Sequence, residues 1–142
     1  MKIRKANYKD QKFVKKLDEE NMKPIIEASG QKYSGLMLDS FNPSKCFIIE
    51  TNGPIGFAYF KITKNKLNIW SIQIVKNKQG KGFGRNLMDH IITFAKEKKL
   101  KKIILEAHDS NEQATEFYDK FGFKRINKSN KKHKIFFEYP LK

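Results

Sequence analysis

A short run of the chain, Gln79-Gly80-Lys81-Gly82-Phe83-Gly84-Arg85, combines three glycines with two cationic side chains. It follows an apolar run and precedes apolar residues at helical spacing. Glycines in such a position let successive backbone N–H groups approach an anion closely, because no Cβ stands in the way. The start of a helix adds partial positive charge, and Lys81 and Arg85 add full charges. The run therefore indicates a pyrophosphate-binding loop, with a plain turn as the alternative.

Two common nucleotide-binding loops do not fit this run. A P-loop requires a glycine, four further residues, then Gly-Lys and Ser or Thr, and no frame around Gly80 supplies that order. A Rossmann fingerprint has the spacing Gly-x-Gly-x-x-Gly soon after the first strand, whereas Gly80, Gly82 and Gly84 are evenly spaced and follow a long predicted meander. The spacing therefore disfavours both an NTPase and a Rossmann dinucleotide site.

A second pattern further along the chain is Asn111-x-x-Ala114-x-x-Phe117-Tyr118-x-x-Phe121-Gly122-Phe123. It resembles the signature N-x-x-A-x-x-L/F-Y-x-x-x-G-F of the GCN5-related N-acetyltransferase (GNAT) family. The first run, Gln79-x-x-Gly82-x-Gly84, is similar to the Q/R-x-x-G-x-G/A pyrophosphate loop of the same family. The separation of the two patterns also agrees, and the resemblance covers the whole chain. It is strongest to an uncharacterised bacterial subgroup, through residues 20–27 and 72–74.

The resemblance implies an enzyme that takes acetyl-CoA as its cofactor. The main chain at the end of the central strand would pair with the pantetheine arm, at Ile74, Val75 and Lys76. The loop N–H groups and one cationic side chain would hold the pyrophosphate, at Gln79, Gly80, Lys81, Gly82, Phe83, Gly84 and Arg85. Asn111 would hydrogen-bond near the pantetheine, and Tyr118 would lie beside the thioester sulfur. No metal is expected, because the three His and Cys46 show no metal-ligand spacing.

Attack of a neutral amine on a thioester needs an acid for the leaving thiolate and a group that takes up the amine proton. Within the resemblance Tyr118 is the acid, and a packed aromatic residue is the alternative. Glu106 is the candidate base, because ribosomal-protein N-terminal acetyltransferases of the family have a Glu at the same spacing from the Tyr. Ser71 and Gln73 stand where the central strand often bears an acidic base, and neither is one. His108 and a water relay therefore stay open as alternatives.

Apolar patterning predicts the elements that would position these residues. Strands are expected at residues 2–5, 46–50, 55–62, 67–75, 101–107, 123–126 and 135–139. A helix is expected from Tyr8 to about Met22, where Pro24 interrupts it before a second short helix, and further helices at 87–99 and 111–121. Strict alternation in the fourth strand would put Leu67, Ile69, Ser71, Gln73 and Val75 on one face.

This order of elements predicts an α/β class with a mixed sheet, in which an antiparallel meander leads into a strand–helix–strand unit. The resemblance implies the GNAT acyl-CoA N-acyltransferase fold, with helices flanking a central mixed sheet that is splayed between strands 4 and 5. No repeat, linker or low-complexity block divides the sequence. Residues 1–142 are therefore expected to form a single N-acetyltransferase domain.

Composition limits the class of protein. The 142 residues are 39% hydrophobic and include 12 Phe, which excludes a disordered chain. No apolar run approaches the ~20 residues that span a bilayer, so no membrane association is expected. A single cysteine, Cys46, excludes an internal disulfide, and the cytoplasm is therefore the expected location.

The formal net charge of +15 attracts polyanions in general. Only Arg4, Arg85 and Arg125 among the 30 basic residues are arginines, whereas phosphate-reading surfaces favour the arginine fork. A nucleic-acid partner is therefore possible but not favoured.

Three functions stay open at this point. The favoured one is an N-acetyltransferase that acts by direct attack in a ternary complex on a small amine or amino acid, with a peptide acceptor as a further option. The second is acetylation of protein N-termini or lysines, and the third is a non-catalytic acyl-CoA- or RNA-binding module. Either a monomer or a homodimer is expected, with the apolar strand 135–139 as a candidate dimer edge.

Overall fold

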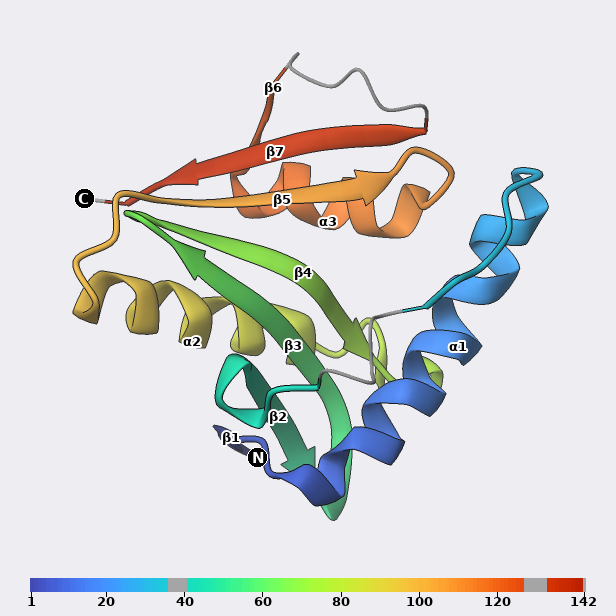
Figure 1. The fold of residues 1–142 in the computed structure, drawn as a ribbon, viewed down its shortest axis with the longest axis horizontal. Helices are drawn as coiled ribbons and strands as arrows, with labels where there is room; N and C mark the ends of the chain where they lie inside the picture. Colours follow the sequence, from blue (N-terminus) through green and yellow to red (C-terminus); the bar gives the residue numbers. More distant parts are fainter. Residues whose placement is uncertain (36–40, 127–132, 142) are drawn as a thin grey trace.

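The computed structural model describes residues 1–35, 41–126 and 133–141 (Figure 1). In these residues the strands form one mixed sheet in the order β1-β2-β3-β4-β5-β7-β6. The strands are β1 (Lys2–Lys5), β2 (Cys46–Thr51), β3 (Gly53–Thr63), β4 (Lys66–Ile74), β5 (Lys102–His108), β6 (Lys124–Ile126) and β7 (Lys134–Pro140). The helices are α1 (Gln11–Ala28), α2 (Phe83–Glu97) and α3 (Glu112–Phe121), with 3-10 turns η1 (Tyr8–Asp10), η3 (Pro43–Lys45) and η4 (Lys76–Lys78). The predicted α/β class with a mixed sheet is confirmed.

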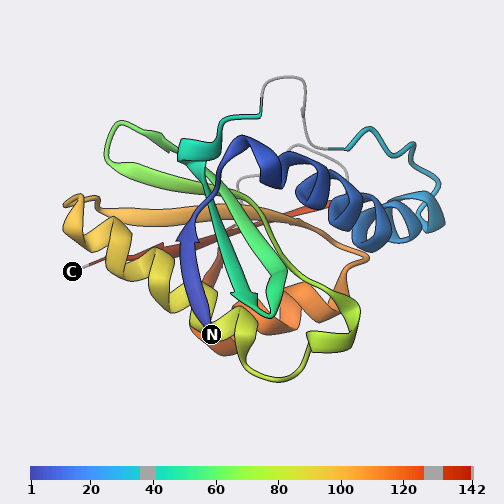
Figure 2. The same ribbon diagram turned by 90° about the horizontal axis from the view of Figure 1, so that it is seen from below.

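Helices cover both faces of the sheet: Figure 2 shows α1 on one face and α2 with α3 on the other. The α1 core, between α1 and the sheet, contains Val14, Leu17, Ile48, Phe57 and Tyr59. The α2–α3 core, on the opposite face, contains among others Ile69, Ile74, Leu87, Ile91, Leu105, Ala107 and Tyr118. Each fully buried Leu or Ile contributes roughly 1.5–3 kcal/mol, so these two cores hold the helices on the sheet.

Strands β4 and β5 separate from each other part-way along their length. Their parallel pairing runs only from Lys66↔Lys102 to Ile69↔Leu105. Beyond that point β4 continues to Ile74, while β5 continues to His108 paired with β7 alone. The two strands diverge as a V toward their C-terminal ends (Figure 1). The predicted splay between the fourth and fifth strands is therefore present.

A bulge in β4 lies at the start of this separation. Tyr59 of β3 pairs with Ser71 and Phe60 pairs with Ile69, which leaves Trp70 as an extra residue in β4. An extra residue reverses the alternation of side chains beyond it. The prediction that Ser71 and Gln73 share a face with Leu67 and Ile69 is therefore wrong. Leu67 and Ile69 share the α2–α3 core with Ile74 instead, whereas the Gln73 side chain contacts α1.

Helix α1 does not end before Pro24, as the sequence suggested, but runs on to Ala28. Proline removes one N–H donor, which leaves the carbonyl of Glu20 without its helical partner. Both Glu20 and Pro24 lie on the exposed side of the helix, where water can bond that carbonyl. The expected second short helix is the continuation of α1, which ends at Ala28. Gly30 follows its C-cap, and a φ of +87° there suits a helix terminus.

Strand β7 is not an edge of the sheet. It pairs with β5 along its length and with β6 over Lys124↔Glu138 to Ile126↔Phe136. The edge on this side is β6, so the apolar strand 135–139 is covered by the chain itself.

Among the helices in the described part of the chain, none has the length and apolar character needed to cross a membrane.

Candidate functional site

The glycine-rich run folds as a turn that leads into α2. Gly80 and Gly82 have φ values of +74° and +88°, a backbone conformation that suits glycine. Gly82 is the N-cap of α2, and no side chain caps the helix there. The first turn of α2 also has no acidic residue. The N–H groups at the start of α2 therefore have the environment of an anion site.

Gln79 fastens this turn to the neighbouring elements. Its Nε2 donates to the carbonyl oxygen of Ile74 at 2.9 Å, and its Oε1 accepts from Gln113 Nε2 at 3.0 Å. The Ile74 carbonyl also accepts from Asn21 Nδ2 of α1 at 3.2 Å. The glutamine of the first motif therefore joins β4, the turn and α3, which fixes where the α2 N-terminus lies.

The charged residues of the run lie at the surface. Lys81 and Arg85 are exposed, and the Arg85 guanidinium lies 5.1 Å from the centre of the Phe121 ring. Gly84 lies inside α2 and is half-buried; a Cβ there would meet the Phe117 ring at 3.6 Å. The third glycine of the run thus belongs to the packing between α2 and α3, and Phe83 is the first residue of α2.

The end of β4 is already engaged within the chain. The Val75 N–H donates to the Ile55 carbonyl at 2.8 Å, and the Val75 carbonyl accepts from Lys78 N–H at 2.9 Å. The Lys76 carbonyl accepts from Gln79 N–H at 3.3 Å. The Val75 N–H is therefore engaged within the chain, whereas its carbonyl has a second lone pair with which a pantetheine arm could pair.

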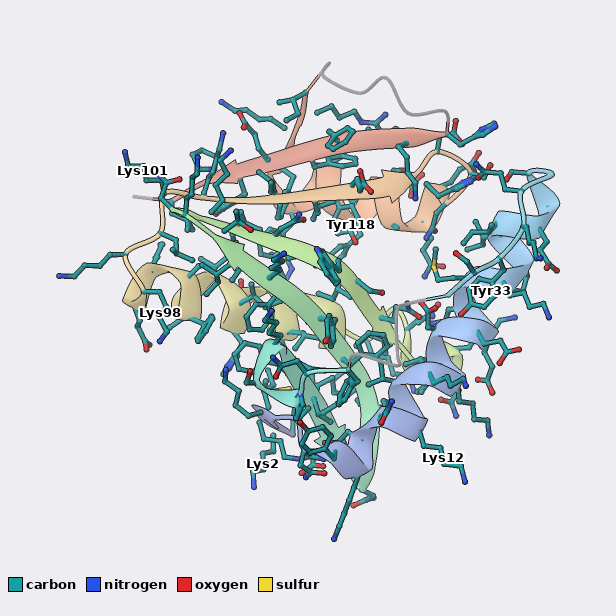
Figure 3. All side chains as sticks on the ribbon, viewed as in Figure 1. Lys2, Lys12, Tyr33, Lys98, Lys101 and Tyr118 are labelled. Atoms are coloured by element: carbon teal, nitrogen blue, oxygen red, sulfur yellow. The ribbon has the colours of Figure 1, made fainter. Side chains whose placement is uncertain are left out.

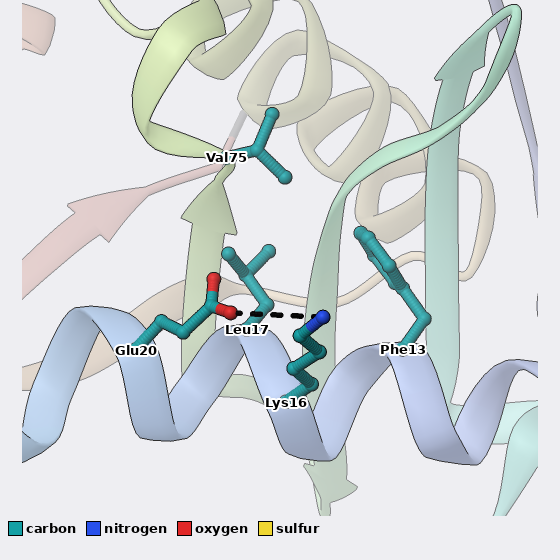
Figure 4. Close-up of a pocket in the computed structure, with 5 residues that line it drawn as sticks. All are labelled: Phe13, Lys16, Leu17, Glu20 and Val75. Carbon is teal, nitrogen blue, oxygen red and sulfur yellow. Dashed lines mark ion pairs between the residues drawn. The ribbon is translucent and has the colours of Figure 1, made fainter.

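A pocket lies beside this segment, between α1 and the end of β4 (Figure 4). It is lined by Phe13, Lys16, Leu17, Glu20 and Val75. Lys16 and Glu20 form an ion pair of 4.0 Å, and both are largely exposed. Such an exposed ion pair adds little stability. It places one positive and one negative charge at the edge of the pocket.

Tyr118 is buried in α3, with 7% of its surface exposed. Its ring packs against Phe117, Phe123 and Phe137, with centroid distances of 5.6, 5.8 and 5.3 Å. Burial raises the pKa of the Tyr118 hydroxyl well above its ordinary value, so the group stays protonated at neutral pH. In Figure 3, Tyr118 lies between β5 and β4 on the side where the strands diverge.

Glu106 and Tyr118 belong to opposite faces of the sheet. Leu105 and Ala107 point into the α2–α3 core that includes Tyr118, so alternation turns Glu106 toward the face of α1. Glu106 is half-buried and is the first β5 residue beyond the last pair with β4. Side chains on opposite faces of a sheet can reach one common space only where two neighbouring strands are apart. β4 and β5 separate at the level of Glu106.

His108 is buried and bonded through both ring nitrogens. Its Nδ1 accepts from the Ser110 N–H at 3.2 Å, and its Nε2 lies 2.6 Å from Gln31 Oε1, so Nε2 is the protonated nitrogen. Burial lowers the His108 pKa, against the opposing effect of Asp109. The nitrogen that could accept a proton, Nδ1, is thus engaged by the Ser110 N–H, which makes His108 a poor general base. The contact of Nε2 with Gln31 connects β5 to the segment that follows α1.

A buried carboxylate, Asp18 of α1, was missed in the sequence. It is 4% exposed and accepts from Gln73 Nε2 at 2.7 Å and from the Tyr33 hydroxyl at 2.5 Å. Burial and then the Asp18 carboxylate raise the pKa of the Tyr33 hydroxyl. The signal was present: Val14, Leu17 and Asp18 share one helical stripe, and a charge on an apolar stripe is unusual.

The sequence comparison decides the family. The sequence model of the acetyltransferase (GNAT) family matches residues 12–123, which is most of the chain. This chain belongs to the GNAT family. It is 35% identical over 80 residues to a [ribosomal protein bS18]-alanine N-acetyltransferase from Haemophilus influenzae strain ATCC 51907 / DSM 11121 / KW20 / Rd. That match covers 56% of this chain and only 54% of the relative, so it spans about half the length of each.

Solved GNAT structures share the fold. The PaiA N-acetyltransferase of Thermoplasma acidophilum, in complex with coenzyme A, superposes with a TM-score of 0.79 at 20% identity and covers 98% of both chains. A GNAT acetyltransferase of Staphylococcus aureus Mu50 gives a TM-score of 0.82 at 16% identity over 99% of both chains. The GNAT fold expected from the two sequence patterns is therefore confirmed.

The second GNAT pattern has a structural task at the start of α3. Asn111 is the N-cap, and its Oδ1 accepts from the Ala114 N–H at 3.2 Å. Its Nδ2 lies 4.0 Å from the Met22 sulfur of α1, so Asn111 stands where β5, α1 and α3 meet.

The described residues hold no cluster of three His, Cys, Asp or Glu that could bind a metal ion.

Proposed function

We propose that this GNAT chain is an acetyl-CoA-dependent N-acetyltransferase that transfers acetyl to a primary amine by direct attack in a ternary complex. The main observation in support of this function is that β4 and β5 separate beyond Ile69 and Leu105, beside the uncapped N-terminus of α2. Family membership supports the reaction class, and so does the partial match to a named N-acetyltransferase. The same findings support acetyl-CoA as the cofactor.

The start of α2 fits the pyrophosphate of the cofactor. Its N–H groups have no side-chain cap, Gly82 has no neighbour within 4 Å of the position of a Cβ, and Lys81 and Arg85 are exposed nearby. Backbone donors, the helix dipole and two full positive charges together suit a diphosphate. When bound, acetyl-CoA supplies the thioester acetyl group that the amine attacks.

Tyr118 is the proposed acid for the departing thiolate. A tyrosine hydroxyl is protonated across the physiological range, so it reaches the reaction as a donor, although burial raises its pKa and makes it a weaker acid. Proton donation to a sulfur that gains negative charge lowers the barrier only within hydrogen-bond reach, which the V between β4 and β5 would allow.

Glu106 is the proposed proton acceptor for the amine. It is half-buried beside the apex of the V, where β4 and β5 part, and it is turned toward the α1 face, opposite Tyr118. An amine entering from the α1 face would meet Glu106 before reaching the thioester. A water relay along this face stays the alternative, because a carboxylate at this position need not touch the nitrogen directly.

The acceptor is proposed to be a primary amine, and a peptide N-terminus gains specific support. The Haemophilus relative is named for acetylating an alanine of a ribosomal protein, and the Glu106–Tyr118 spacing resembles that of such enzymes. The expectation of a small amine or amino acid stays a prediction. So do the single domain, the cytoplasmic location and the choice between monomer and homodimer.

The deciding experiment follows release of free CoA from acetyl-CoA with a panel of peptides, amino acids and polyamines. Acetyl-CoA affinity is measured in parallel by calorimetry. Turnover of one acceptor class that Gly82→Glu abolishes would establish the reaction and the acceptor together. Absence of acetyl-CoA binding by the wild-type protein would overturn the proposal.

A further inference from the structure

A buried polar cluster joins α1 to the separated part of β4. Asp18 accepts from Gln73 Nε2 at 2.7 Å, and the same Nε2 donates to Ser71 Oγ at 2.6 Å. Tyr33 donates to the other oxygen of Asp18. Ser71 and Gln73 follow the Trp70 bulge, beyond the last residue of β4 that pairs with β5. The cluster therefore lies on the α1 face beside the V.

Its hydrogen bonds fix the orientation of the Gln73 amide. Both partners of Nε2 are oxygens, and a reversed amide would press Oε1 against the Asp18 carboxylate at 2.7 Å. With the amide held this way, Gln73 Oε1 is a buried acceptor that has no hydrogen-bond partner among the described residues. Gln73 itself is only 7% exposed. A buried acceptor without a donor is costly, so a donor that comes within reach of this oxygen is bound favourably.

The charge of the cluster points to the kind of donor. Within the described part of the chain, the hydrogen bonds to Asp18 come from neutral donors, Gln73 and Tyr33, and no ion pair is formed there. A buried carboxylate without a counter-charge favours a cation in its neighbourhood.

We propose that Gln73 binds the acceptor through Oε1, which accepts a hydrogen bond from an N–H of the incoming amine, and that Asp18 is a positioning residue. Asp18 holds the amide in the orientation that presents Oε1, and its charge selects acceptors that arrive as ammonium ions. The inference rests on the proposed function. It narrows the acceptor to alkylamines and peptide N-termini, because arylamines are uncharged at neutral pH.

A simple structural tie between α1 and β4 is the competing explanation. In that case loss of the tie would lower stability without a specific effect on the acceptor. Asp10 provides a matched control, because it is a buried aspartate of similar exposure, 5% against 4%, in the same part of the chain. It is bonded to Arg4 of β1, away from the V.

The test compares Gln73→Met and Asp18→Asn with Asp10→Asn, using the acceptor that the wild-type protein turns over fastest. We expect both cluster variants to raise the acceptor KM on the order of tenfold, while acetyl-CoA affinity is unchanged. Asp10→Asn should lower the Tm without raising the acceptor KM. Wild-type activity should also favour an alkylamine over an arylamine of similar size.

The outcomes separate this inference from the proposed function. Unchanged acceptor KM in Gln73→Met and Asp18→Asn, with normal wild-type turnover, would overturn the inference and leave the enzyme intact. A wild-type protein that consumes no acceptor would overturn both. If Asp18→Asn does not fold, Gln73→Met alone decides, since methionine keeps the length of the side chain and removes only its polar atoms.

Discussion

Gly82 and Gly30 share one backbone conformation, with φ values of +88° and +87°, and a Cβ at either position would meet nothing within 4 Å. They occupy opposite kinds of helix terminus. Gly82 caps the start of α2 in the proposed pyrophosphate site, whereas Gly30 follows the end of α1. Substitution of either residue therefore imposes the same backbone strain, and only one of them touches the proposed cofactor.

The first prediction uses this pair. Gly82→Ala and Gly30→Ala should each lose about 1 kcal/mol of stability, because alanine is strained at positive φ. Only Gly82→Ala should weaken acetyl-CoA binding, since relief of the strain turns the N–H groups at the start of α2. Chemical denaturation and calorimetry measure the two effects. Equal acetyl-CoA affinity in the two variants would contradict the assignment of this loop.

The second prediction concerns the third glycine. Gly84 has no positive φ and lies inside α2, where a Cβ would make ordinary contact with Phe117 at 3.6 and 3.7 Å. Gly84→Ala should therefore stabilise the protein by about 0.5–1 kcal/mol through helix propensity. Its Tm should rise while acetyl-CoA affinity stays the same. A lower Tm would mean that α2 and α3 pack more closely than the structure has them.

The third prediction separates chemistry from packing at Tyr118. Tyr118→Phe keeps the buried ring and removes the hydroxyl, so kcat should fall by about 10²-fold or more if that hydroxyl is the acid. Tyr139→Phe is the control, because Tyr139 packs on Phe121 and Phe123 of the same aromatic group. Both variants should keep the wild-type Tm. Loss of activity in both would assign the effect to packing.

The fourth prediction distinguishes Glu106 from a water relay. Glu106→Gln keeps the size of the side chain and removes its basicity, so direct proton uptake by Glu106 requires a fall in kcat of about 10²-fold. Glu138→Gln is the control, since it breaks only the 3.2 Å pair with Lys102 on the same pair of strands. A Glu106→Gln enzyme with nearly normal kcat at saturating acceptor would favour the relay.

The two sequence patterns predicted the fold and the outline of the site because local physics decides both. Glycines with positive φ before an uncapped helix start, and an asparagine that caps α3, act on their immediate neighbours. The succession of strands along the chain was predicted from the alternation of apolar residues and from turn residues. The splay between β4 and β5 came from the family resemblance, because no local pattern marks where two paired strands part.

What the sequence did not predict depends on contacts between distant residues. The position of the bulge, at Trp70, is defined by pairing with β3, and the bulge alone turns Ser71 and Gln73 toward α1. Asp18 and Gln73 are far apart in the chain, so their bond at 2.7 Å could not be read from spacing. The helix continues past Pro24 because its surroundings are exposed and tolerate the lost hydrogen bond, and that exposure is set by the tertiary fold.

The last prediction concerns stability at mildly acidic pH. His108 is buried, and its Nδ1 accepts from the Ser110 N–H, so a proton on Nδ1 would break that bond. Burial lowers the His108 pKa; Asp109 opposes the shift, while Lys134 and His133 add to it. His90 is shifted the same way by burial, with Glu97 opposing. The unfolded chain therefore takes up protons near pH 6.5, before the folded protein does.

Stability should consequently fall as the pH drops below about 6.5, and should level off once the lowered pKa of the folded state is passed. Urea denaturation between pH 5 and pH 8 measures this slope, in a range above the titration of the carboxylates. His108→Gln and His90→Gln should each flatten it, and the double variant should flatten it most. His133→Gln serves as the comparison on the exposed side of the His108 ring, 5.6 Å away between centroids. A double variant with the wild-type slope would show that these two histidines are not the groups that link protons to folding.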